Sequence, residues 1–321
     1  MKKIFISLLS ATLFFVSCEN SSDENIINED LNALQKSEQQ CASMEVLDLN
    51  LANDPTLFSK MEAIENHTNN YLAKGLSKRL VNGVIEIPVV FHVIYRTSAE
   101  NIPTSQLQDQ IDALNEDFNL NNPGRNTIPA EFAAVEADVN INFVLGQVIR
   151  VQNTKKRSWR PDDSMKFTSS GGSDVVDPQN NLNIWVVNNM PYHGGNILGY
   201  AQFPGGSWST DGVVLDRRFT GTTQYSTGRT ATHEVGHWMN LRHIWGDGGC
   251  GASDFVDDTP DADGPSRGCP TYPTASCGTN NMTMNFMDYS DDDCLNMFSV
   301  GQKSRMDAVF TSGGFRAVMA Q

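Results

Sequence analysis

The chain has 321 residues, of which 39% are apolar and 9% aromatic, so it is long enough to bury a substantial core. A disordered tail protein and a disulfide-stapled mini-scaffold are therefore excluded. The 38 acidic and 23 basic residues give a formal net charge of −15, and the nearest candidate for a basic patch, Lys155-Lys156-Arg157, is short enough to be a solvated loop. We expect no nucleic-acid partner, because phosphate backbones repel a chain this acidic.

The first 18 residues have the features of an export signal. Lys2 and Lys3 precede an apolar run, Ile4–Val16, that is too short to cross a hydrocarbon core of ~30 Å. The following Cys18 and polar stretch resemble a bacterial lipoprotein signal in which Cys18 carries the lipid. We predict a signal peptide at 1–18 and export, either to the bacterial surface as an outer-membrane lipoprotein or as a secreted protein. An ordinary secretory signal with an incidental cysteine is the alternative.

Residues 19–80 are predicted to be a removable pro-segment. They are polar, rich in Asn, Ser and Glu, and contain only weak helical patterns at Ile26–Leu34 and Leu57–Leu76. The segment ends at Lys78 and Arg79, a basic pair of the kind that processing proteases cut. We therefore expect cleavage at this pair.

Strand and helix patterns then follow one another. Ile85–Tyr95 is apolar and β-branched over most of its length, which predicts a buried strand. Thr104 or Ser105 is expected to cap an amphipathic helix with an apolar stripe of Leu107, Ile111, Leu114 and Phe118. Further strands are predicted at Ile141–Leu145, Leu182–Val187, Tyr200–Phe203 and Gly212–Leu215. This order of elements predicts an α/β fold.

The last quarter of the chain is rich in loops and cysteines, and a terminal helix is predicted at about Ser299–Phe310. In an oxidising compartment its four cysteines suggest two disulfides, with three pairings open: Cys250, Cys269, Cys277 and Cys294. Cross-links, with or without a metal, would stabilise a segment that buries little apolar surface.

A cluster of histidines between Thr232 and His243 carries the chemistry. His233 and His237 are four residues apart, so on a helix both imidazoles can reach one ion, and Glu234 can reach a water on that ion. His243 lies six residues beyond His237, which suits a chain that turns sharply and returns a third nitrogen. Three neutral nitrogens and one water form the open tetrahedral site of catalytic zinc. The spacing therefore predicts Zn²⁺ held by the three histidines.

This motif, followed by Met287 in Asn285–Tyr289, resembles that of the metzincin metalloproteases, and within them the pappalysin-like group of the ulilysin type. The resemblance extends over nearly all of the chain after the signal and implies that Met287 is a structural residue beneath the metal. The family has Gly at the position of Asn240. Because Asn tolerates the left-handed backbone better than any other residue except Gly, we expect the turn to be preserved.

The resemblance implies two catalytic domains with a cleft between them. The upper domain, 81–243, would combine a mixed twisted sheet with the active-site helix, and the lower domain, 244–321, would be loop-rich, disulfide-linked and closed by a C-terminal helix. The resemblance also favours the pairs Cys250–Cys277 and Cys269–Cys294.

The implied activity is that of a zinc endopeptidase. Zinc lowers the pKa of its bound water towards ~7, and Glu234 would take the proton and pass it to the leaving amine. Tyr289 matches the family's tyrosine that hydrogen-bonds the developing oxyanion, with core packing as the alternative. Tyr200–Phe203 is the candidate edge strand for pairing with an extended substrate.

Cys41 in the pro-segment resembles the inhibitory cysteine of this family. A thiolate is a strong zinc ligand and would displace the catalytic water, so we expect a latent zymogen that is activated by loss of residues up to about Arg79. An incidental cysteine is the alternative.

Two acidic stretches carry further expectations. The resemblance favours Ca²⁺ in the loop from Asp254 to Pro260, against the alternative of a solvated acidic loop; its oxygen ligands would come from Asp254, Val256, Asp257, Asp258 and Thr259. Asp293 precedes Cys294, where family members that cut before Arg or Lys have an acidic residue at the floor of the S1′ pocket. This residue predicts cleavage on the amino side of Arg and Lys.

The expected partners are protein or peptide substrates, with membrane contact only through an N-terminal lipid, and the chain is expected to be a monomer. Two other functions are weighed against the peptidase: a catalytically silent surface-binding lipoprotein and a zinc hydrolase of non-peptide substrates. The intact Glu234 and the three histidines argue against the first, and an acidic pocket with an edge strand argues against the second.

Overall fold

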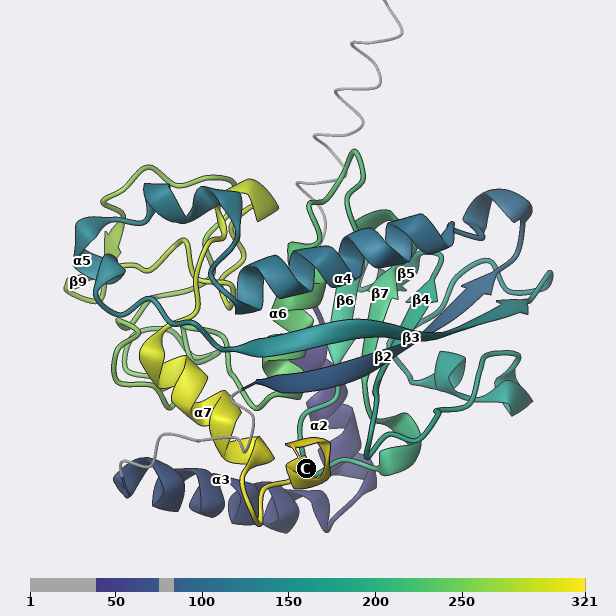
Figure 1. The fold of residues 1–321 in the computed structure, drawn as a ribbon, viewed down its shortest axis with the longest axis horizontal. Helices are drawn as coiled ribbons and strands as arrows, with labels where there is room; N and C mark the ends of the chain where they lie inside the picture. Colours follow the sequence, from purple (N-terminus) through teal and green to yellow (C-terminus); the bar gives the residue numbers. More distant parts are fainter. Residues whose placement is uncertain (1–38, 75–83, 321) are drawn as a thin grey trace, which may run out of the picture. The chain divides into compact units, whose positions relative to one another are not determined.

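A mixed β-sheet forms the centre of the computed structural model, which describes residues 39–74 and 84–320 (Figure 1). The strand order is β1-β6-β7-β4-β2-β3, and β5 also pairs with β6. β2, β3, β4 and β7 run parallel, whereas β6 runs antiparallel to β7. The strands are β1 (Gln39–Cys41), β2 (Ile85–Tyr95), β3 (Ile141–Gln152), β4 (Leu182–Val187), β5 (Met190–Tyr192), β6 (Gly195–Ala201) and β7 (Val213–Asp216).

Helices cover one face of this sheet. α4 packs on β3 and on α6, and α6 packs on β6 and β7. The apolar stripe predicted for α4 is buried in the core between helices and sheet. The other face of the sheet packs against a second apolar cluster that includes Trp159, Met165, Trp185 and Tyr200. The helices are α2 (Ser43–Asn53), α3 (Leu57–Ala73), α4 (Thr104–Phe118), α5 (Ala130–Ala133), α6 (Arg229–Trp238) and α7 (Val300–Phe310).

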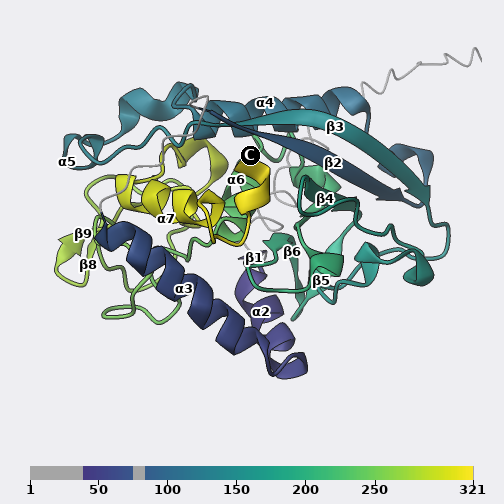
Figure 2. The ribbon, with the colours of Figure 1, turned by 60° about the horizontal axis from the view of Figure 1, so that its bottom comes forward.

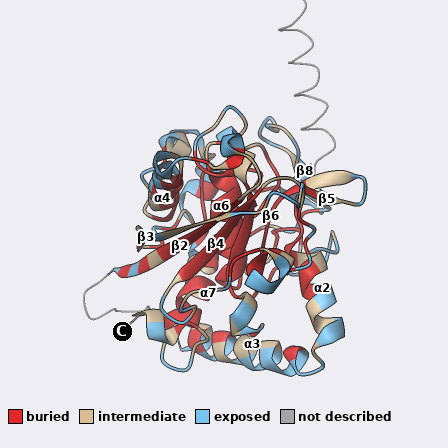
Figure 3. Cartoon of the chain, turned by 90° about the vertical axis from the view of Figure 1, so that its right-hand side faces the viewer, coloured by how far each residue is buried: buried red, intermediate tan, exposed pale blue. Residues whose placement is uncertain are grey.

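The architecture is the predicted α/β fold, and several boundaries agree with the sequence. β2 and β4 have the predicted bounds, because both lie inside the sheet and their apolar runs are buried (Figure 3). α7 begins after Ser299, which forms a capping box with Gln302.

Other boundaries differ from the prediction. The N-cap of α4 is Pro103 and not Thr104 or Ser105, because Thr104 already has helical backbone. β3 continues to Gln152, seven residues beyond Leu145, paired with β2 along its length. β6 spans Gly195–Ala201 and not Tyr200–Phe203, since its glycines interrupt the apolar pattern used to predict strands.

The loop-rich segment after α6 holds a small hairpin, β8 (Ala275–Ser276) with β9 (Thr279–Asn280), and two disulfides. The disulfides are Cys250–Cys277 and Cys269–Cys294, the pairing that the family resemblance implies.

The segment Gln39–Ala73 lies against the rest of the molecule. β1 extends the sheet beside β6, and α3 runs alongside α7 (Figure 2). Within the described part of the chain, none of the helices combines the length and apolar character needed to cross a membrane.

Candidate metal centre

α6 and the turn after it bring three histidines together. His233 and His237 lie on the same face of α6, and the Nε2 atom of His237 is 3.1 Å from Nε2 of His233 and 3.1 Å from Nε2 of His243. All three side chains are buried. With the Cys41 thiol they form a group whose ligand atoms lie within 4.8 Å of one another.

The other ring nitrogens show that this cluster is built for a cation. Nδ1 of His233 and of His237 each lie 2.8–2.9 Å from a backbone carbonyl, of Phe286 and Leu241 respectively, and Nδ1 of His243 lies 2.5 Å from Asp247. A carbonyl oxygen only accepts, so these Nδ1 atoms carry the protons and the Nε2 lone pairs converge. Converging lone pairs repel unless a cation lies between them, so the donor set fits zinc.

The electrostatics of the cluster favour neutral imidazoles. Burial, and then the charge of His243, lower the pKa of His233 to about 3. The same two causes, followed by His233, lower the pKa of His237 well below its ordinary value. Neutral histidines are the form that binds a metal.

A left-handed residue returns His243 to the cluster. Asn240 has φ of +74°, as the sequence analysis predicted, and the amide of Leu241 donates to Gly236 O at 3.0 Å. This ends α6 at Trp238, with Met239 as its C-cap, and directs the chain back towards His237.

Met287 packs against α6 beneath the histidines. It is fully buried, and a Cβ on Gly236 would lie 2.4 Å from its Sδ atom. The preceding residue, Phe286, supplies the carbonyl that orients His233. The turn therefore supports the metal-binding helix from below.

Glu234 lies beside the cluster and is covered by Cys41 and Ser43. Ser43 Oγ donates to Glu234 Oε2 at 2.8 Å, and Cys41 Sγ lies 3.5 Å from the same oxygen. Burial raises the pKa of Glu234 to about 8, although the hydrogen bonds from Ser43 and Cys41 lower it. Burial also raises the pKa of the Cys41 thiol, an effect that a coordinated cation reverses.

Tyr289 borders the cluster on the side of the Met287 turn. Its ring centroid is 5.5 Å from that of His233 and 5.0 Å from that of His243. Its hydroxyl donates to the carbonyl of Cys41 at 3.4 Å. The hydroxyl thus already binds a peptide carbonyl next to the metal-ligand cluster.

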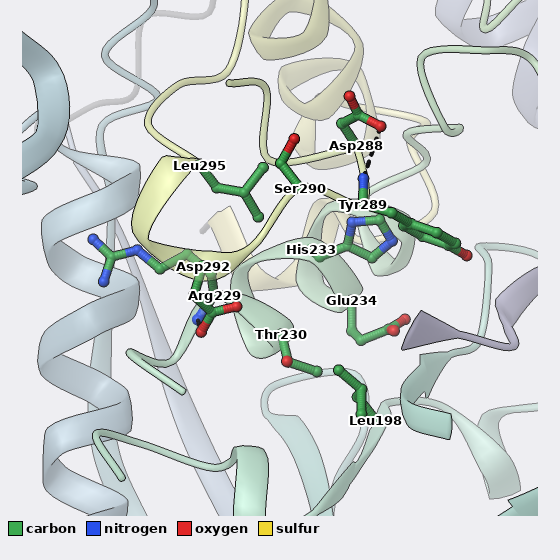
Figure 4. Close-up of a pocket in the computed structure, with 10 residues that line it drawn as sticks. All are labelled: Leu198, Arg229, Thr230, His233, Glu234, Asp288, Tyr289, Ser290, Asp292 and Leu295. Carbon is green, nitrogen blue, oxygen red and sulfur yellow. Dashed lines mark hydrogen bonds between the residues drawn. The ribbon is translucent and has the colours of Figure 1, made fainter. Parts of the chain in front are cut away.

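A pocket opens beside His233 and Glu234, and its acidic lining includes Asp288 and Asp292 (Figure 4). Asp293, which the sequence predicts at the pocket floor, is exposed and does not line this pocket. The residues Asp292–Cys294 form a 3₁₀ turn, in which successive side chains point about 120° apart. The turn directs Asp292 inward and its neighbour to solvent.

Asp292 is fixed by the N-terminus of α6. Its Oδ2 atom accepts from Ser226 Oγ at 2.6 Å and from the amides of Thr227 and Arg229 at 2.8 and 3.2 Å. All three bonds fall on one oxygen, which leaves Oδ1 for a ligand in the pocket. The Arg229 guanidinium also lines the pocket and lies 3.0 Å from Asp117.

The acidic loop predicted to bind calcium is held by internal hydrogen bonds. Asp254 is buried and accepts from Val256 N at 3.1 Å and Thr259 Oγ1 at 2.6 Å. Asp258 accepts from Ser299 Oγ and from Gly301 N, at 2.5 and 2.8 Å, and so caps α7. Asp257 is exposed.

Two functional contacts escaped the sequence analysis. Ser43, which donates to the Glu234 carboxylate, lies two residues after Cys41 but belongs to no motif that would mark it in the sequence. Asp247, which orients His243, follows it by four residues and could have been found as a helix-type pair. Cys18, Lys78 and Arg79 lie outside the described residues.

Sequence comparison places the chain among metalloproteases. The family model Peptidase_M43, described as pregnancy-associated plasma protein-A, matches residues 170–311. An extracellular metalloprotease of Arthroderma benhamiae is 31% identical over 248 residues, covering 74% of this chain and 82% of that protein. Extracellular metalloprotease 1 of Coccidioides posadasii is 33% identical over 247 residues, covering 73% and 79%.

Solved structures agree. A promirolysin mutant of Tannerella forsythia superimposes with a TM-score of 0.77 at 36% identity, covering 88% of this chain and 97% of that one. Mature mirolysin of the same organism, in complex with a cleaved peptide, has a TM-score of 0.70 at 39% identity and covers 74% and 95%.

Proposed function

Since the chain belongs to the pappalysin family of metzincin metalloproteases, and is therefore a zinc-dependent peptidase, we propose that it is made as a latent zymogen and cuts peptide bonds on the amino side of Arg and Lys. The observation that carries the proposal is the meeting of His233, His237, His243 and Cys41 beside Glu234. Family membership favours this function over a silent binding lipoprotein or a hydrolase of non-peptide substrates.

The side chains of the site have distinct roles in this proposal. Zinc held by His233, His237 and His243 would supply a Lewis acid and a water of lowered pKa. Glu234, which lies beside the metal-ligand cluster, takes the proton of the attacking water and passes it to the leaving amine. Tyr289 donates to the substrate carbonyl oxygen, as it now donates to Cys41 O.

β6 is the strand along which an extended substrate would lie. Ile197 pairs with Met190 on one side and Gln39 on the other, and Gly199 pairs with Leu215 and Cys41. β1 therefore occupies the outer edge of β6, and its removal frees that edge for a peptide. The peptide bound to mature mirolysin supports this class of substrate.

Replacing Cys41 by alanine should raise the peptidase activity of the uncleaved chain at least about tenfold, because a lost ligand bond worth only ~1.4 kcal/mol already has that effect. The measurement is hydrolysis of a quenched fluorescent peptide, with an electrophoretic check that the chain is intact. Leu49→Ala is the control, since Leu49 is an exposed residue of the nearby helix α2. Equal latency of the Cys41→Ala variant and the parent would contradict the role of the thiol.

The specificity proposal assigns the S1′ carboxylate to Asp292. A guanidinium or ammonium in the pocket can reach Oδ1, and an apolar side chain cannot satisfy it. Asp292→Asn should lower kcat/KM for substrates with Arg or Lys after the scissile bond by about 10- to 100-fold. Asp293→Asn makes the same substitution at the neighbouring residue and should leave kcat/KM for these substrates unchanged. The reverse ranking of the two variants would restore Asp293.

Processing and export complete the proposal. The same specificity would cut Ser77-Lys78 or Lys78-Arg79 and separate residues 19–80 from a monomeric enzyme with an upper domain, 81–243, and a lower domain, 244–321. Relatives named extracellular metalloproteases support secretion. A lipid on Cys18 would anchor the precursor, and a mass measurement of the membrane fraction tests this.

Calcium is proposed at the loop of Asp254, Val256, Asp257, Asp258 and Thr259. Burial raises the pKa of Asp254 to about 6, although the hydrogen bonds of Thr259 and Val256 and the charge of Arg305 lower it, and Ca²⁺ would supply a further counter-charge. Added Ca²⁺ should raise the melting temperature of the zinc-loaded chain, and Asp254→Asn should remove the increase. An unchanged melting temperature for the parent would contradict the site.

A further inference from the structure

The pro-segment rests on the catalytic part through a small apolar contact. The cluster that joins them consists of Leu47, Leu57 and Phe203, with three partly buried neighbours, Met44, Leu51 and Met61. α3 runs along α7 (Figure 2), and polar contacts join the two, from Glu65 to Arg305 and from His67 to Ala308 O and Thr311 Oγ1. Polar contacts therefore contribute to the binding of this helix.

The strongest of these contacts is between Glu65 of α3 and Arg305 of α7. Both carboxylate oxygens accept from the guanidinium, Oε1 from Nη1 at 2.8 Å and Oε2 from Nη2 at 2.9 Å. The Arg305 side chain is only 1% exposed, and its guanidinium also donates to the carbonyls of Asn240 and Phe255 at 3.3 and 3.4 Å. The planar guanidinium of Arg305 is thus held in position by other residues of the catalytic part.

The charge of Arg242 also favours a carboxylate at this point. Burial raises the pKa of Glu65, but the hydrogen bonds and charge of Arg305 and the charge of Arg242 lower it, and the net pKa lies below its ordinary value. Arg242 stacks on Phe203 with its guanidinium carbon 4.3 Å from the ring centroid.

We propose that Arg305, supported by the charge of Arg242, forms a carboxylate-binding site on the catalytic part, separate from the zinc centre, and that Glu65 occupies it. Through this site the pro-segment stays bound as an inhibitor after the chain is cut at Lys78-Arg79. The inference rests on the proposed function in treating residues 19–80 as a pro-segment. Its consequence is that one cut does not activate the enzyme, and that activity appears only as the fragment dissociates or is cut again.

The test measures retention of the fragment instead of activity. The full chain carries Glu234→Ala, to prevent self-digestion, and an inserted site for an exogenous site-specific protease between Lys78 and Arg79. After complete cleavage, native mass spectrometry follows the dissociation of the fragment over time. We expect Glu65→Gln, which keeps the shape and removes the charge, to speed dissociation at least about tenfold.

The matched control is Glu62→Gln, because Glu62 is an exposed carboxylate on the same helix. It should dissociate at the parent's rate, and Arg305→Lys, which keeps the charge without the fork, should fall between the parent and Glu65→Gln. Melting of the uncleaved variants checks that each is folded before cutting. Equal dissociation rates for the parent, Glu65→Gln and Glu62→Gln would overturn the site.

The two proposals fail in different ways. If Cys41 did not cause latency, the uncleaved chain with Glu234 intact would be active, yet the dependence of retention on Glu65 would be unaffected. If the carboxylate site did not hold the fragment, the uncleaved chain would still be latent. Only the dissociation rate of the fragment after cutting would no longer depend on Glu65.

Discussion

Replacing Glu234 by glutamine should lower kcat/KM for peptide hydrolysis by about 10²- to 10⁴-fold in the mature enzyme. Glutamine keeps the shape of the side chain but cannot accept a proton from water at neutral pH. Ser43 and Cys41 both contact this carboxylate, at 2.8 and 3.5 Å. Steady-state kinetics with a peptide substrate gives the ratio.

Metal content is the control for this variant. Glu234 is not part of the ligand cluster, so the zinc content of Glu234→Gln should equal that of the parent, whereas His237→Ala should lose both zinc and activity. A Glu234→Gln enzyme that retains zinc and full activity would show that another group moves the proton.

Replacing Arg316 by methionine should lower the free energy of unfolding by about 3–5 kcal/mol, the usual cost of removing one partner of a buried ion pair. Arg316 is fully buried and binds both oxygens of Asp211 at 2.9 and 3.0 Å. It also donates to Trp238 O at 3.0 Å and lies 3.6 Å from the centre of that ring. Its loss leaves Asp211 charged at the end of the metal-binding helix. Urea denaturation of the Glu234→Ala chain measures the difference.

An exposed ion pair provides the comparison. Lys60 and Asp54 are 3.0 Å apart with side chains 50% and 43% exposed, so Lys60→Met should cost no more than about 1 kcal/mol. The double variant Asp211→Asn with Arg316→Met should recover part of the loss, because it removes the buried charge. Equal stability of Arg316→Met and Lys60→Met would refute this interpretation.

The fold was predictable where burial on both faces makes a strand apolar throughout. β2 and β4 are such strands, and the apolar stripe of α4 is an equally clear pattern in the sequence. β6 was misplaced because its glycines give it little side-chain pattern, and its edges are set by pairing with β7 and β1. α2 was missed because its few buried residues face a surface formed by distant parts of the chain.

The metal cluster was predictable because helix geometry alone brings His233 and His237 together. The pocket carboxylate was not, because three consecutive aspartates differ only in the rotation of a 3₁₀ turn, which the bonds of Asp292 to the start of α6 determine. The contact between Glu65 and Arg305 joins residues 240 positions apart and has no local pattern.

Mapping of new peptide termini tests the central claim most directly. A mixed proteome is incubated with the activated enzyme, or with Glu234→Ala, and the termini are identified by mass spectrometry. The account predicts new N-termini that begin with Arg or Lys and depend on Glu234. Termini that appear equally with both samples, or no new termini after confirmed loss of the Cys41 segment, would contradict it.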